Sequence, residues 1–244
     1  MAVSDQPMAP KFWAIIPAAG VGRRMNVDIP KQYLEIRGKT LIEHTLERLI
    51  DFPTLEKIVV VLGAGDEYAR DIDLLDHQKI LLAEGGKERS HSVMNGMEAL
   101  KSHALPEDWV LVHDAARPCI RRADLDWLVE CLKDHEVGGL LGTPVRDTMK
   151  RTGPDDSVIE TVERCSLWHA FTPQMFRFAI LEKALATAVR NQVPITDEAS
   201  AIEYAGFKPM MVEGHTDNIK VTSGPDLALA SLHIEQQSKL IESL

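Results

Sequence analysis

Residues 12–25 have the sequence FWAIIPAAGVGRRM, and residues 30–34 have the sequence PKQYL. The first five residues are apolar, aromatic or β-branched, which predicts a buried β-strand. The loop that follows is rich in small residues, whose backbone N–H groups can approach an anion closely. It ends with Arg23 and Arg24, whose planar donor groups suit phosphate oxygens. A strand that leads into such a loop is how many α/β proteins bind a nucleotide phosphate.

The glycine pair at residues 20–22 does not identify a ligand by itself, because a lone Gly-x-Gly fits a surface turn equally well. The buried strand before it, and the arginines and Lys31 after it, favour phosphate binding instead. The loop lacks the Gly-Lys-Ser/Thr of a Walker A motif. Met25 stands where a dinucleotide-binding fingerprint has its third Gly or Ala.

The composition is that of an acidic globular protein large enough for a sizeable core. In 244 residues, 27 Lys and Arg stand against 37 Asp and Glu, which gives a net charge of −10. This balance argues against a nucleic-acid partner, which needs a basic domain. An anionic ligand must therefore meet a local basic patch.

Cysteines and apolar runs bear on the compartment. Cys119, Cys131 and Cys165 are odd in number and show no Cys-x-x-Cys pairing, so we expect free thiols in a reducing cytoplasm. No apolar run has the length of a membrane span, so no membrane partner is expected. Residues 1–11 are polar and proline-containing, and we expect a flexible N-terminal tail before a single domain over residues 12–244.

Strand and helix patterns alternate along the first half of the chain. A capping box at Thr40-x-x-Glu43 predicts the first helix. Further strands are expected at 58–62, 79–82 and 109–113. Helices are expected at about 66–75 and 123–135, and a third is expected to follow the stretch 85–92 and to end at residue 100. This alternation predicts an α/β fold with a doubly wound, mostly parallel, Rossmann-like sheet.

The second half of the chain has a different pattern. Residues 143–172 predict a β-hairpin with a turn at 153–156, which we expect to be a β-arm that pairs with a partner subunit; the alternative is a surface flap. Beyond it we expect helices from Gln174 or Met175 to Arg190, from about 196 to Gly206, and from Ser223 onwards. Strands are expected at 210–212 and 218–222.

Ligands of such sheets bind beyond the carboxyl ends of the strands, where the loops 17–25, 85–92 and 113–118 should meet. Asp114 follows a buried strand, and Arg117 could hold it ionised; the alternative is a structural ion pair. Asp114 could also help to position Mg²⁺. The histidines show no metal-binding spacing, and His113 and His169 are expected to be structural.

Taken together, these motifs resemble those of the 2-C-methyl-D-erythritol 4-phosphate cytidylyltransferase family, from about Trp13 to the last helix. The resemblance rests on the two stretches quoted first and on HDAARP (113–118), PVRDTMK (144–150), LWHAFTPQ (167–174), TDEAS (196–200) and DNIKVT (217–222). It implies a nucleotidyltransferase that moves the cytidylyl group of CTP to 2-C-methyl-D-erythritol 4-phosphate and releases pyrophosphate. This is a step of non-mevalonate isoprenoid biosynthesis, and it implies Mg²⁺ as cofactor and a cytoplasmic homodimer.

The resemblance also implies roles for individual residues. Arg24 and Lys31 would be catalytic, stabilising a pentacoordinate transition state. Nucleotide-binding residues would be Ala18, Ala19, Gly20, Gly86, Lys87, Ser92, Asp114 and Ala115. Residues around the methylerythritol phosphate would be Arg117, Thr148, Arg164, Thr172 and Lys220, with Thr148 and Arg164 supplied by the arm of the other subunit; Asp114 would also lie near this substrate.

Two positions depart from the family pattern. Lys87 stands where some relatives have an acidic residue, and Cys165-Ser166 stands where Asn-Gly or Asp-Gly is usual. A similar family uses ribitol 5-phosphate, but the sequence PAAG at 17–20 favours the methylerythritol enzymes over the Ala-Gly-Gly form of that family. A dinucleotide-dependent oxidoreductase and a non-catalytic nucleotide-binding regulator are the alternatives from other functional classes.

Overall fold

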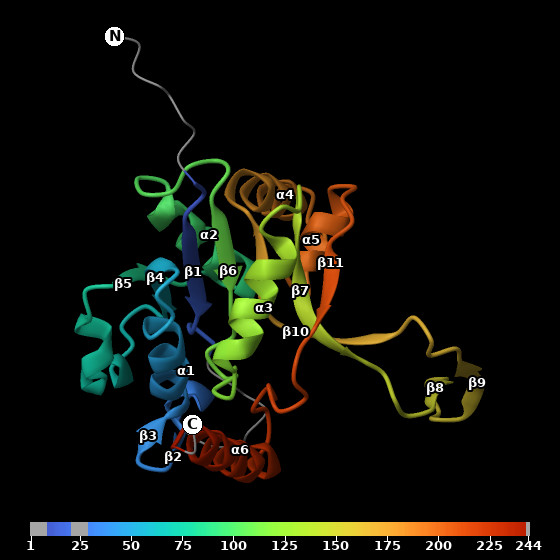
Figure 1. Ribbon diagram of the computed structural model, residues 1–244. Coiled ribbons are helices and arrows are strands. Elements are labelled where there is room, and N and C mark those ends of the chain that lie inside the picture. The colour runs from blue at the N-terminus through green and yellow to red at the C-terminus, as the bar shows by residue number, and fades with distance from the viewer. Residues whose placement is uncertain (1–8, 21–28, 243–244) are drawn as a thin grey trace.

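A seven-stranded sheet forms the centre of the computed structural model, which describes residues 9–20 and 29–242 (Figure 1). Its strands lie in the order β11-β7-β10-β6-β1-β4-β5. Their bounds are β1 (Phe12–Pro17), β4 (Leu55–Leu62), β5 (Ile80–Glu84), β6 (Trp109–Val112), β7 (Gly138–Pro144), β10 (Trp168–Arg177) and β11 (Met210–Glu213). Within this sheet β10 runs antiparallel to both of its neighbours, and the other pairings are parallel. The predicted doubly wound, mostly parallel sheet is thereby confirmed.

Helices cover both faces of the sheet. They are α1 (Leu41–Ile50), α2 (Arg89–Leu100), α3 (Arg122–Leu132), α4 (Phe178–Arg190), α5 (Glu198–Tyr204) and α6 (Gly224–Glu242). In β1, Ala14 and Ile16 pack with α1 and α3, whereas Trp13 and Ile15 pack with α2, α4 and α5. Neighbouring side chains of a strand point to opposite faces, so a strand that is apolar throughout must be covered on both sides. Each fully buried isoleucine contributes roughly 1.5–3 kcal/mol.

The helix α1 begins as its capping box predicts. The hydroxyl of Thr40 accepts a hydrogen bond from the Glu43 backbone N–H at 3.3 Å, and the Glu43 carboxylate accepts one from the Thr40 N–H at 2.7 Å. The predicted acidic helix at 66–75 is wrong in type, because two short 3₁₀ helices occupy that stretch, η3 (Tyr68–Asp71) and η4 (Asp73–Asp76). A third, η2 (Lys31–Tyr33), follows the glycine-rich loop.

The structure corrects the prediction of a helix beginning at Gln174 or Met175. Residues 168–177 form β10, and the helix begins only at Phe178. Met175 and Phe176 are both fully buried but lie on opposite faces of the sheet, which is strand geometry. Only residues 174–177 of the predicted helix belong to the strand, and their two apolar side chains are too few to show whether the period is that of a strand or of a helix. Strand β7 was not predicted either.

The predicted late strand at 218–222 is also wrong. This segment joins no sheet, but it runs beside the loop that follows β6. The Val221 N–H donates to the Ala116 carbonyl at 2.8 Å, and Arg117 Nη1 donates to the Asn218 carbonyl at 2.7 Å. The segment therefore serves the loop at the edge of the sheet rather than the sheet itself.

The predicted hairpin is present and projects from the body of the molecule (Figure 1). It consists of β8 (Met149–Thr152) and β9 (Val158–Val162), which pair antiparallel. Val158 and Ile159 are 60% and 65% exposed. A second small sheet, β2 (Glu35–Ile36) with β3 (Lys39–Thr40), leads into α1.

The glycine-free return from the hairpin closes without strain. The Leu167 N–H donates to the Arg164 carbonyl at 2.9 Å, and neither Cys165 nor Ser166 is among the residues with positive φ. A turn of this kind needs no glycine, so the departure from the family pattern leaves the backbone path open.

Across residues 9–20 and 29–242, no helix combines the length and the apolar character needed to cross a bilayer. The three cysteines are free thiols.

Candidate active site

A hollow lies at the carboxyl ends of β1, β5 and β6, where three loops were predicted to meet. Its described lining includes Pro17 to Gly20, Gly86 to Arg89, Ser92, Asp114 to Ala116, Lys31, Gln32 and Lys220. The first loop is described only as far as Gly20, so Arg23 and Arg24 lie outside the described residues. For the part of the chain that the structure describes, the predicted meeting of the three loops is confirmed.

Lys31 reaches this hollow from the short helix η2, which is anchored on both sides. Gln32 Nε2 donates to the Ala18 carbonyl at 2.6 Å, and the Tyr33 hydroxyl donates to Asp66 Oδ2 at 2.8 Å. Burial and the nearby Asp66 carboxylate raise the pKa of Tyr33 well above its usual value, so it remains a donor. The ammonium of Lys31 is therefore carried by a fixed piece of backbone beside the glycine-rich loop.

The second loop depends on glycine for close packing. A Cβ placed on Gly85 would lie 2.2 Å from the Cβ of Ala19 in the first loop, far inside contact distance. The Gly86 N–H donates to Ser92 Oγ at 3.1 Å, and this hydroxyl donates to the Glu88 carbonyl at 3.3 Å. The two loops thus form one surface in which small residues expose backbone groups to the hollow.

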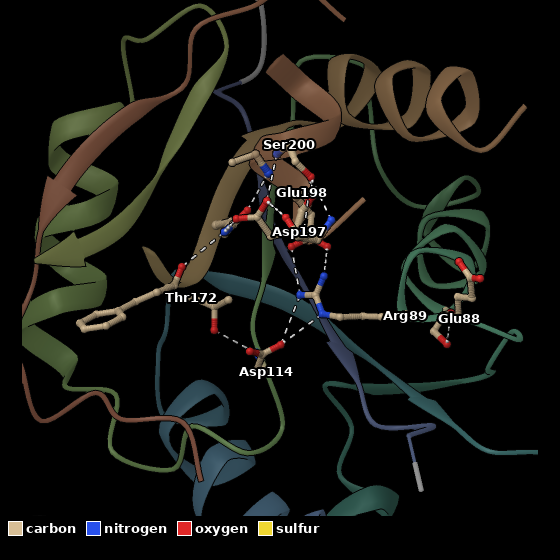
Figure 2. Close-up of polar contacts among 12 residues, drawn as sticks. Glu88, Arg89, Asp114, Thr172, Asp197, Glu198 and Ser200 are labelled. Atoms are coloured by element: carbon tan, nitrogen blue, oxygen red, sulfur yellow. Dashed lines mark hydrogen bonds and ion pairs between the residues drawn. The ribbon is translucent and has the colours of Figure 1, made fainter. Parts of the chain in front are cut away.

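Asp114 is the most heavily contacted charge of the site. Its Oδ2 lies 2.8 Å from Lys220 Nζ and 3.6 Å from Arg117 Nε. Its Oδ1 lies 3.3 Å from Arg89, and this contact is drawn in Figure 2. Burial alone would raise the pKa of this carboxyl, but Arg89, Lys220 and Arg117 together hold its pKa well below the usual range. Asp114 is therefore ionised at neutral pH, and Arg117 is only one of the three cations responsible.

His113 is structural, as predicted. Thr172 Oγ1 accepts a hydrogen bond from the Asp114 backbone N–H at 3.1 Å, so its own proton is free to point at His113 Nδ1, 2.9 Å away. The other ring nitrogen, Nε2, then donates to the Arg117 carbonyl at 3.1 Å. Burial lowers the pKa of His113 to about 4, which keeps the ring neutral and locks this arrangement.

A second hollow adjoins the first and shares Arg89, Asp114 and Lys220 with it. Its other lining residues are Arg117, Ala170 to Thr172, Gln174, Thr196 and Asp197. The residues predicted to meet the acceptor phosphate within one chain, Arg117, Thr172 and Lys220, all line this hollow.

Thr148 and Arg164 lie elsewhere. Both belong to the projecting arm and its return, where they are exposed, and Arg164 contacts the Arg146 carbonyl. Lys87 is also exposed, and it lines the first hollow. The single chain therefore brings together every described site residue except Thr148 and Arg164, which were predicted to act in the partner's site.

Sequence reasoning missed Arg89 and Glu198. Arg89 Nη1 and Nη2 donate to the two carboxylate oxygens of Glu198 at 2.6 and 3.1 Å, and the same guanidinium faces Asp114 (Figure 2). Arg89 stands inside the loop at 85–92 and Glu198 inside the TDEAS motif, but no pattern linked two stretches so far apart in the sequence.

The residues present do not fit a metal ion held by the protein. Among residues 9–20 and 29–242 no three His, Cys, Asp or Glu side chains cluster in a way that could hold one. Asp114, the predicted metal-contacting residue, already faces three cations, and their charge opposes the approach of a divalent cation.

A mostly parallel sheet with a glycine-rich loop, a dense group of cations and an ionised aspartate at its carboxyl edge defines an α/β nucleotide-binding enzyme. More narrowly, the chain belongs to the 2-C-methyl-D-erythritol 4-phosphate cytidylyltransferase family, whose model matches residues 12–236. Members of this family are CTP-dependent nucleotidyltransferases of isoprenoid biosynthesis. The match confirms the resemblance inferred from the sequence and decides against an oxidoreductase.

Individual relatives agree with this assignment. The chain is 49% identical over 224 residues to the 2-C-methyl-D-erythritol 4-phosphate cytidylyltransferase of Vibrio vulnificus, covering 92% of this chain and 94% of the relative. It is 50% identical over 226 residues to that of Hahella chejuensis, covering 93% and 94%. The crystal structure of the Francisella tularensis enzyme matches with a TM-score of 0.79 at 36% identity, covering 91% of this chain and 99% of that chain.

The close packing of the two loops makes a prediction. We expect Gly85→Ala to raise the KM for CTP by roughly 10-fold or more, because the new methyl must push the loop away from Ala19, and a displacement of about 1 Å can cost up to ~10²-fold. Steady-state kinetics with CTP as the varied substrate measures this effect.

Gly63→Ala is the matched control, since a Cβ at Gly63 would meet only ordinary contacts, 3.8 Å from the Ala19 carbonyl. It should leave the KM for CTP unchanged. An unchanged KM in Gly85→Ala would show that the packing of the two loops does not shape the nucleotide site.

Proposed function

We propose that the chain catalyses its family's reaction with CTP in the first hollow and 2-C-methyl-D-erythritol 4-phosphate in the second. The observation that carries this arrangement is that the two hollows adjoin and share Arg89, Asp114 and Lys220. A nucleotide whose base lies on the Gly86–Ser92 loop and whose phosphates face Lys31 would present its α-phosphorus towards the second hollow.

In the proposed reaction a 4-phosphate oxygen of the acceptor attacks the α-phosphorus of CTP. A new P–O bond forms, the bond from the α-phosphorus to the bridging oxygen breaks, and pyrophosphate leaves with the electron pair. A phosphate monoester has a second pKa of about 6, so the nucleophile is already ionised at neutral pH and needs no general base. This explains why a site with neutral, structural His113 suffices for the chemistry.

Catalysis then requires charge neutralisation and alignment rather than proton transfer. We assign Lys31 and Arg24 to the negative charge that develops on the pentacoordinate phosphorus. Ala19 and Gly20 would offer backbone N–H groups to the nucleotide. Ala18, whose N–H donates to the Val61 carbonyl at 2.8 Å, would lie against the nucleotide together with Ala115. Gly86, Lys87 and Ser92 would meet the cytosine; because the Lys87 side chain is exposed, we assign its contact to the backbone.

The acceptor phosphate would lie against Lys220, whose side chain is 38% exposed although its ammonium also pairs with Asp114 at 2.8 Å. Arg117 is more constrained, since its guanidinium donates to the Asn218 carbonyl and stacks on Phe171 at 5.0 Å. We therefore assign Arg117 to the positive field of the hollow and Thr172 to its wall. Thr148 and Arg164 of the partner subunit would close it from outside.

We propose that the homodimer forms through the arm at about 143–172, within a single nucleotidyltransferase domain spanning 12–244. Exposed Val158 and Ile159 on an isolated hairpin support this proposal, because a lone two-stranded sheet is marginal without a packing partner. We assign Mg²⁺ to the substrate, since it would arrive on the triphosphate oxygens of CTP. The free cysteines suit a cytoplasmic enzyme.

Pyrophosphate release tests the substrates directly. With Mg²⁺, we expect release only with CTP among the four nucleoside triphosphates, and only with methylerythritol phosphate as acceptor. Ribitol 5-phosphate is the control acceptor. Equal release with ribitol phosphate would keep the chemistry but contradict the proposed acceptor, and no release from folded protein would contradict the proposed activity.

Removing a transition-state donor should act on turnover. We expect Lys31→Ala and Arg24→Ala each to lower kcat by roughly 10²-fold or more, the scale for a lost transition-state contact. Lys39→Ala removes a surface ammonium that pairs with Glu47 and is the matched control, with kcat unchanged. A rise in KM with kcat unchanged would instead place Lys31 and Arg24 in ground-state binding.

Sharing of sites across the dimer can be tested with mixed chains. A Lys31→Ala chain paired with an Arg164→Ala chain has one site with both changes and one site with neither. We expect verified heterodimers to recover about half of the wild-type activity, far above either parent. Activity no higher than the mean of the two parents would show that the arm serves its own chain.

A further inference from the structure

Arg89 stands at an unfavourable end of its helix. It is the first residue of α2, where the helix dipole disfavours a cation, and no side chain caps this end. Its position must therefore be set by contacts from outside the helix. Those contacts are two carboxylates, Glu198 and Asp114, one on each side of the guanidinium (Figure 2).

The two carboxylates hold Arg89 unequally. Glu198 accepts two hydrogen bonds side by side, at 2.6 and 3.1 Å, whereas the contact of Arg89 with Asp114 is longer, at 3.3 Å. A bidentate pair fixes the plane of the guanidinium as well as its distance. Glu198 therefore decides which edge of Arg89 faces Asp114.

Glu198 is not needed to start its own helix. The N-terminus of α5 is closed by a reciprocal capping box between Asp197 and Ser200. The side chain of Glu198 is 1% exposed, and it lines neither of the two hollows. Within residues 9–20 and 29–242, the side chain that pairs with this buried carboxylate is Arg89.

We propose that Glu198 is a positioning residue for cytidylyl transfer. It holds Arg89 in the plane that orients Asp114, and through Arg89 it connects the start of α2 to the wall of the second hollow, where the acceptor would bind. This inference rests on the proposed function. Since α2 begins directly after the Gly85–Glu88 loop, the contact joins the nucleotide side of the site to the acceptor side.

Glu198 also balances charge. Arg89, Arg117 and Lys220 carry three positive charges against two negative charges on Asp114 and Glu198, a net of +1. Neutralising Glu198 raises this to +2 and frees Arg89 to turn towards substrate phosphates. Phosphate binding would then persist while the alignment of the reacting groups is lost.

The test combines Glu198→Gln with Arg89→Lys and the double variant. We expect Glu198→Gln to lower kcat roughly 10-fold or more, by misalignment on the scale of about 1 Å, while the KM for CTP stays within about threefold. If Glu198 acts through Arg89, the kcat of the double variant should lie within about twofold of the kcat of Arg89→Lys. The effects of substitutions at two contacting residues are then not additive. Glu198→Asp, which keeps the charge, should recover part of the lost kcat.

Glu203→Gln is the matched control, because it makes the same chemical change at an exposed position of the same helix. It should leave kcat near wild type. A kcat for Glu198→Gln within twofold of wild type, or effects that multiply in the double variant, would overturn the proposal.

Crystal structures of the same variants keep the test independent of activity. Glu198→Gln should displace the Arg89 guanidinium from Asp114, and Glu203→Gln should not. An undisplaced guanidinium would overturn the proposal even in an inactive protein. If Arg89 is displaced in Glu198→Gln but the wild-type protein shows no cytidylyltransferase activity, the proposed function is refuted and the positioning of Arg89 by Glu198 is not.

Discussion

The site depends on one buried negative charge, the carboxylate of Asp114. An ionised carboxylate is costly to bury unless cations and hydrogen bonds compensate it, and removing one partner of a buried ion pair typically costs about 3–5 kcal/mol. Here the compensation comes from three separate segments, since Arg89 begins α2, Arg117 follows β6, and Lys220 lies near the C-terminal helix. Asp114 thus fixes where three otherwise independent stretches of chain meet. The same stretches form the walls of both hollows.

This arrangement suits transfer between two anions. The cations that hold Asp114 ionised also give the hollows a positive field within a chain whose net charge is −10. The field is local, because charges separated by more than about 10 Å are largely screened at ordinary ionic strength. An acceptor that is already ionised needs such a field and a defined geometry. It does not need a proton acceptor, and His113 is held neutral within a closed hydrogen-bond chain.

Much of this was predictable from local pattern. The buried strand at 12–16, the capping box at Thr40, the hairpin and the position of Asp114 at the end of a strand each depend on neighbouring residues alone. The end of strand β10 was not predictable, because residues 174–177 have only two apolar side chains, too few to show a strand period before the apolar helix that follows. The contact of Arg89 with Glu198 joins residues 109 positions apart, and the roles of the arm depend on a second chain. Long-range charge pairs of this kind need the fold before they can be recognised.

The central claim is that the two hollows around Asp114 hold the two substrates side by side. A crystal structure with a non-hydrolysable CTP analogue and 2-C-methyl-D-erythritol 4-phosphate tests it most directly. The account predicts cytosine on the Gly86–Ser92 loop, the α-phosphate beside Lys31, and the acceptor phosphate against Lys220 within reach of the α-phosphorus. An acceptor phosphate outside the hollow lined by Arg117 and Thr172, or a nucleotide turned with its base towards Asp114, would contradict it.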